Sequence, residues 1–128
     1  MTNSKQKGKR GELEWVKKCK EHGFDDVYRG QQYNGAKGNA DVEGLPFIHC
    51  EVKRTEALSL YAALEQAKSE ARPGEIPIVP HRKNGEPWVI IMSADDWFDL
   101  YKVWRHWHCV VPFAEQDEDE GGDADDVL

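Results

Sequence analysis

The segment that most constrains the fold is residues 47–54 (FIHCEVKR), an apolar stretch that carries Glu51 and Lys53 near its end. Side chains alternate between the two faces of a β-strand, so Glu51 and Lys53 share a face. The predicted faces are Phe47, His49, Glu51 and Lys53 on one side and Ile48, Cys50 and Val52 on the other. Inside a sheet, such charges are costly unless they are paired or bind a metal. The alternative is a solvated strand edge, where an ion pair adds about 0–1 kcal/mol.

Three further segments have the apolar spacing of helices: residues 10–22, 58–72 and 94–105. Gly23 follows the first as a stop signal, and Ser93 precedes the third as an N-cap. The predicted apolar stripes are Leu13, Val16 and Cys19 in the first helix, Leu60, Leu64, Ala67 and Ala71 in the second, and Trp97, Leu100, Tyr101 and Trp104 in the third.

Strand signals separate these helices, and the glycine-rich segment 33–39 (YNGAKGN) is typical of a loop. The predicted strands are residues 25–32, a short segment with Asp41 and Val42, residues 47–54, 76–80 and 87–92, the last two joined by a turn at 83–85. This order predicts an α/β domain with a central mixed β-sheet flanked by helices.

Charge is distributed unevenly along the 128 residues, whose formal net charge is −7. Residues 115–128 contain eight acids and no base, which predicts a disordered acidic tail after a domain of residues 1–114. Without these eight acids, the chain has 16 acidic residues and 17 lysines and arginines. A nucleic-acid partner is therefore compatible with the composition. The candidate phosphate contacts, each with ordinary surface charge as the alternative, are Lys5, Lys7, Lys9, Arg10, Arg29, Lys37, Arg54, Lys68 and Arg72.

Several classes of protein are disfavoured. The chain has no run of about 18 apolar residues and begins with a polar segment, so we expect neither a membrane span nor a secretory signal. Three sparse cysteines argue against a disulfide framework and favour a reducing, cytoplasmic location. His106, His108 and Cys109 lack a fourth nearby ligand, which disfavours a zinc site there.

Asp41 and Glu51 converge if the two short strands that carry them pair as a hairpin. Two carboxylates then form an oxygen site suited to Mg²⁺. A cation there polarises a scissile phosphate and acidifies a bound water. Lys53, on the same face as Glu51, would hold that water or neutralise charge on the phosphate.

The ordered pattern resembles the PD-(D/E)xK nuclease superfamily, and most closely the archaeal-type Holliday junction resolvases and their phage-borne relatives. The similarity lies in KGKRGELEWVKKCKEHGF (7–24), in GNADVEG followed by IHCEVKR, and in LEQAKSEA (64–71), and it spans residues 5–105. The resemblance implies a restriction-endonuclease-like core. Ala40 stands where the family has proline, a position that bears no ligand.

The resemblance also assigns roles. Asp41, Glu51 and the Val52 carbonyl would bind the metal, and Lys53 would be the catalytic lysine. Glu12 would complete the site from the first helix, and Gln66 matches a helical glutamine near it. Glu43 is a second acid close to Asp41, so the exact ligand set stays open. His49, on the Glu51 face, is a further candidate lining residue.

The function that follows is a Mg²⁺-dependent endonuclease, with Mn²⁺ as a possible substitute, acting on branched DNA as a homodimer. Four-way junctions are the first substrate to consider, and a phage or host-cell cytoplasmic setting fits the resemblance. Two alternatives remain open at this stage: a related nuclease acting on flaps, ends or a specific duplex site, and a DNA-binding module without catalysis.

Overall fold

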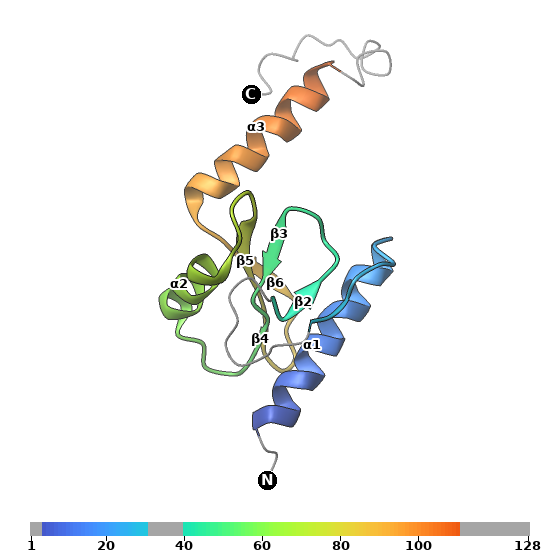
Figure 1. Ribbon diagram of the computed structural model, residues 1–128, viewed down its shortest axis with the longest axis vertical. Coiled ribbons are helices and arrows are strands. Elements are labelled where there is room, and N and C mark those ends of the chain that lie inside the picture. The colour runs from blue at the N-terminus through green and yellow to red at the C-terminus, as the bar shows by residue number, and fades with distance from the viewer. Residues whose placement is uncertain (1–3, 31–39, 111–128) are drawn as a thin grey trace. The chain divides into compact units, whose positions relative to one another are not determined.

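The computed structural model describes residues 4–30 and 40–110 (Figure 1), and the predicted loop at 33–39 and tail at 115–128 lie outside them. Three helices are present in this part: α1 (Ser4–Glu21), α2 (Leu60–Glu70) and α3 (Ala94–Val110). Helix α1 begins six residues before the predicted start, in a stretch rich in lysine and glutamine, which favour helix. Gly23 at φ 94° closes α1, with Phe24 N donating to the Cys19 carbonyl at 3.1 Å in a Schellman motif.

The strands form one mixed sheet, which confirms the predicted α/β class. They are β1 (Tyr28–Arg29), β2 (Val42–Glu43), β3 (Ile48–Cys50), β4 (Lys53–Arg54), β5 (Ile76–Arg82) and β6 (Val89–Ile91). The order is β1-β2-β3-β5-β4, with β6 paired to β5. Strands β3 and β4 run parallel to β5, and the other pairs are antiparallel.

The predicted strand at 47–54 is interrupted at Glu51 and Val52, where β3 ends and β4 has not begun. The pairing with β5 keeps one register through the interruption, because Ile48 lies opposite Ile76 and Lys53 opposite His81, an offset of 28 residues in both cases. Glu51 N still donates to the Ile78 carbonyl at 3.0 Å. The interruption is therefore a local change in hydrogen bonding at the site residues, without a slip between strands.

The two faces of the sheet carry separate cores, and Figure 1 shows α1 and α2 on opposite sides of it. On the α1 side the buried residues are Trp15, Val16, Cys19, Val27, Val42, Cys50, Val52 and Ile78. On the α2 side they are Ala63, Ala67 and Val79. Ile78 and Val79 are neighbours on β5, so their opposite assignments follow from strand alternation. The same alternation directs Glu51 and Lys53 away from the α1 core.

All three predicted apolar stripes need correction. In α1, Leu13 is 47% exposed, whereas Trp15 is buried with Val16 and Cys19. In α2, Ala63 and Ala67 are the buried residues, whereas Leu60 is 41% exposed, because the small alanines let the helix approach β5 closely. In α3, Trp97, Leu100 and Trp104 are 43–54% exposed rather than buried. The chain divides into two compact units at Met92 and Ser93, and α3 belongs to the second. Its aromatic rings instead contact one another, as in the stacked pair Trp97 and Tyr101 at 5.3 Å.

The start of α3 agrees with the sequence. Ser93 Oγ accepts a hydrogen bond from Asp96 N at 3.3 Å, the bond expected of an N-cap serine. Within residues 4–30 and 40–110, we find no helix that is both long enough and apolar enough to span a membrane.

Gly11 sets how closely α1 lies on β4, because a methyl group there would overlap Arg54 Cβ. We expect Gly11→Ala to lower the free energy of unfolding by about 1–2 kcal/mol, since overpacking outweighs the gain of about 1 kcal/mol in helix propensity. Gly8→Ala is the matched control, because its methyl group has no described neighbour within 4 Å and should stabilise α1. Urea denaturation measures both variants. Equal stabilisation by the two would contradict this packing.

Candidate metal and nucleic-acid site

Asp41 lies beside the strand interruption and causes part of it. Its backbone N donates to the Cys50 carbonyl at 3.1 Å, which continues the β2–β3 pairing. The next hydrogen bond in that direction comes from a side chain, because Asp41 Oδ2 accepts from Val52 N at 2.9 Å. The Val52 amide is thus held by a carboxylate instead of a strand partner.

The electrostatic environment of Asp41 is unfavourable for its negative charge. Burial, followed by the nearby carboxylates of Glu51 and Glu12, raises the pKa of Asp41 to about 7, against the opposing effects of the Val52 N–H and Lys53. The pKa of Glu12 is also raised, first by burial and then by Glu51, although Arg29 opposes this. The carboxylates of Glu12 on α1, of Asp41 just before β2 and of Glu51 at the β3–β4 interruption are therefore near enough to repel one another.

Gln66 on α2 connects the other two predicted residues. Its Nε2 donates to Glu51 Oε2 at 2.9 Å, and its Oε1 accepts from Lys53 Nζ at 3.2 Å. One amide thereby holds the carboxylate and the ammonium group on the same side of the sheet, as the predicted faces require. Glu51 is 2% exposed, and its Oε1 has no hydrogen-bond partner among the described residues.

Glu12 and Glu43 each have a positive partner. Arg29 Nε donates to Glu12 Oε1 at 2.6 Å, so Arg29 neutralises part of the acidic group while its side chain stays 40% exposed. Glu43 Oε2 accepts from Ala40 N at 3.1 Å and lies 3.7 Å from Arg72. Glu43 thus supports the backbone before Asp41.

A second polar group surrounds His49, which is fully buried in β3. Its Nε2 lies 3.5 Å from Glu51 Oε1, and its Nδ1 lies 3.7 Å from Glu75 Oε1. Burial alone lowers the pKa of His49, but the carboxylates of Glu51, Glu75 and Glu70 outweigh it and raise the pKa. Burial, followed by the charge of Glu51, raises the pKa of Glu70. His49, Glu51 and Glu70 have the spacing of a possible metal site.

Sequence reasoning missed Glu70 and Glu75. Glu70 follows Gln66 by four residues on α2, so the two share a helix face, and this spacing was an available signal. Glu75 follows the turn at Pro73 and Gly74, and only the parallel pairing of β3 with β5 brings it to His49. No local pattern indicates that contact.

The basic residues predicted to contact phosphates differ in their exposure to solvent. Lys9, Arg10, Arg29, Lys68 and Arg72 are exposed. Lys5 and Lys7 belong to α1, and Lys37 lies outside the described residues.

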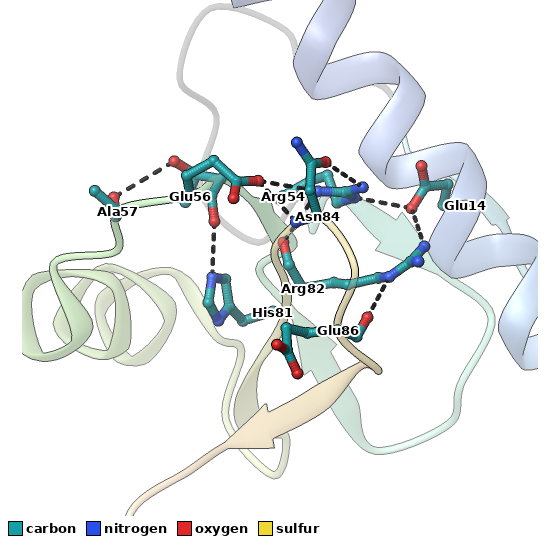
Figure 2. Close-up of polar contacts among 9 residues, drawn as sticks. Glu14, Arg54, Glu56, Ala57, His81, Arg82, Asn84 and Glu86 are labelled. Atoms are coloured by element: carbon teal, nitrogen blue, oxygen red, sulfur yellow. Dashed lines mark hydrogen bonds and ion pairs between the residues drawn. The ribbon is translucent and has the colours of Figure 1, made fainter.

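Arg54, by contrast, is bound within the protein, as Figure 2 shows. Its Nε donates to Glu14 Oε1 at 3.0 Å, and its guanidinium also reaches Asn84 Oδ1 at 3.0 Å. Arg82 contacts the same Glu14 oxygen at 3.3 Å. This cluster joins α1 to β4 and to the turn before β6, so we assign Arg54 a structural role.

Comparison with protein-family models, with curated proteins and with solved structures gave no match. The resemblance to the nuclease superfamily therefore rests on the sequence motifs alone.

Proposed function

We propose that this protein is a metal-dependent endonuclease that hydrolyses phosphodiester bonds in branched DNA, with the four-way junction as its foremost substrate. The observation that carries the proposal is the grouping of Asp41, Glu51 and Lys53 at the β3–β4 interruption. Buried carboxylates that repel one another are stabilised by a bound cation. The mixed sheet is compatible with the restriction-endonuclease-like core that the resemblance implies.

The donor set fits a divalent cation. Glu51 Oε1 is buried and makes no hydrogen bond to the described residues, so one oxygen remains for a ligand. Asp41 has its charge disfavoured by Glu51 and Glu12, which a cation would reverse. Asp41, Glu51 and the Val52 carbonyl would hold Mg²⁺, or Mn²⁺ in its place, since hard oxygen donors suit these ions. When bound, the ion would polarise the scissile phosphate and lower the pKa of a water.

The chain's own residues supply orientation and positive charge. Gln66 fixes the Glu51 carboxylate by one bond and the Lys53 ammonium by another, so the two groups keep a set separation. Lys53 then donates to the attacking water or to a phosphate oxygen, where it offsets the charge that develops in the transition state. Glu12, held by Arg29, contributes a third carboxylate from α1. The Val52 N–H keeps Asp41 in place.

Exposed basic side chains would hold DNA through its phosphates. Lys9 and Arg10 on α1, and Lys68 on α2, belong to helices that also carry site residues. Such contacts give affinity and position without reading sequence. Symmetric resolution of a junction needs two cuts, so the proposal includes a homodimer with one site in each protomer.

A substrate comparison tests the proposal against a nuclease with another target. A labelled four-way junction, a Y-fork and a linear duplex of the same sequence are incubated with the purified chain in Mg²⁺. We expect paired cuts in the junction at a rate at least about tenfold above that for duplex, a difference of about 1.4 kcal/mol in activation free energy. Faster cutting of the Y-fork or the duplex would contradict the junction as substrate. Binding without any cutting would favour a non-catalytic module.

A further inference from the structure

The buried imidazole of His49 is not explained by the proposed nuclease site. Its side chain has no exposed surface, yet neither ring nitrogen forms a hydrogen bond with a described residue. Glu51 Oε1, the atom nearest Nε2, also lacks one. Buried polar atoms in native proteins nearly always form hydrogen bonds. Where one does not, binding of an ion at that position is one recognised explanation. These atoms face one another across a short gap.

The dimensions of the gap suit a metal ion. Two ligand atoms bound to Zn²⁺ at 2.0–2.1 Å in a tetrahedron lie about 3.3 Å apart. His49 Nε2 and Glu51 Oε1 are 3.5 Å apart, which is within ion-pair distance and close to that separation. Glu70 on α2 provides a third donor, and one ligand atom from each of the three residues lies within 4.8 Å of the others.

A carboxylate lies near the other ring nitrogen, on the side where a metal-bound histidine usually has its supporting acceptor. Histidines that ligate a metal generally donate their second ring N–H to a carboxylate or carbonyl, which fixes the ring. His49 Nδ1 faces Glu75 Oε1 at 3.7 Å. Glu75 is in turn held by Arg72, whose backbone N donates to it at 2.9 Å and whose guanidinium lies 3.3 Å away.

We propose that His49, Glu51 and Glu70 form a binding site for a divalent transition-metal ion of the zinc type, with Glu75 as the residue that positions His49. An imidazole nitrogen with carboxylates suits Zn²⁺, whereas Mg²⁺ prefers oxygen donors alone. The site adjoins the oxygen site at Asp41 and Val52, and the Glu51 carboxylate belongs to both. The inference does not depend on the proposed nuclease function.

The test is isothermal titration of the full chain with Zn²⁺ in the presence of excess Mg²⁺. Helix α3 carries the exposed residues His106, His108 and Cys109, which can bind Zn²⁺ on their own. Every protein in the comparison therefore also carries His106→Gln, His108→Gln and Cys109→Ser. In this background we expect one Zn²⁺ per chain, which Mg²⁺ does not displace.

Single substitutions then locate the ion. His49→Gln and Glu70→Gln should each weaken Zn²⁺ binding at least about 100-fold, and Glu75→Gln about 10–100-fold, as loss of a supporting carboxylate does. The exposed control Glu65→Gln should leave the affinity within about threefold. If the nuclease proposal alone is wrong, the protein will cleave no DNA, but its variants will still show this pattern of Zn²⁺ affinities.

Three results would overturn the inference: no Zn²⁺ bound by the unsubstituted site, undiminished binding in both His49→Gln and Glu70→Gln, or an equal loss of binding in Glu65→Gln. Far-UV circular dichroism checks that each variant is folded. His49 is buried, so its substitution can unfold the protein. If the His49→Gln variant fails this check, Glu70→Gln decides the outcome, because the Glu70 side chain is only partly buried.

Discussion

Glu51→Gln is expected to slow cleavage of a four-way junction at least about 10³-fold while leaving junction affinity within about threefold, because about 4 kcal/mol of transition-state stabilisation depends on the cation held there. The amide has nearly the volume of the carboxylate, and its oxygen can still accept from Gln66 Nε2. The substitution also removes a negative charge that raises the pKa of Asp41. Single-turnover cleavage in Mg²⁺ measures the rate, and a gel shift in EDTA measures affinity.

Two companion variants make this result specific. Glu65→Gln changes the same charge at an exposed position of α2 and should cleave like the unsubstituted protein. Asp41→Asn should lose cleavage as Glu51→Gln does, because its amide oxygen can still accept from Val52 N while its charge is gone. Full activity in both Asp41→Asn and Glu51→Gln would show that these residues do not hold the cation.

Lys53→Ala is expected to lower the single-turnover cleavage rate by about 10²–10³-fold, the usual effect of removing one donor aimed at developing charge. Gln66 contacts both Lys53 and Glu51, so in the proposed mechanism the ammonium group would act on the reacting phosphate rather than on distant DNA. The rate should fall at saturating junction, with little change in the concentration needed for saturation. Lys53→Arg should recover part of the rate, because it keeps the charge with a different shape.

Lys83→Ala is the matched control for Lys53, since it removes an exposed lysine from the turn before β6. It should leave both rate and affinity within about threefold. If Lys53→Ala instead weakened junction binding and left the saturated rate unchanged, Lys53 would be a phosphate contact without a catalytic role.

Much of the fold follows from local patterns. Alternation in residues 47–54 predicts which side chains of β3 and β4 face each helix, and Gln66 contacts both Glu51 and Lys53 as that alternation requires. The turn at 83–85 and the Ser93 cap depend only on neighbouring residues. Asp41 was expected to approach Glu51 through a hairpin, and β2 does pair antiparallel with β3.

Other features depend on contacts between distant segments. The interruption at Glu51 and Val52 arises because the Val52 N–H donates to the Asp41 side chain instead of to a strand partner. Strand propensity does not predict such a contact. Arg54 looks like a surface base in the sequence, yet Glu14 and Asn84, far away in the chain, bind it. The exposed aromatics of α3 show the limit of helical periodicity, which identifies an apolar face without identifying what covers it.

The most direct test of the central claim is cleavage of a labelled four-way junction by the unsubstituted chain, with Mg²⁺, with EDTA, and with Mg²⁺ restored in excess over the EDTA. Our account predicts paired cuts in Mg²⁺, none in EDTA, and full recovery when the ion returns, because the carboxylates of Asp41 and Glu51 act only through the cation they hold. Cleavage that persists in EDTA, or no cleavage of any DNA in Mg²⁺ or Mn²⁺, would contradict it.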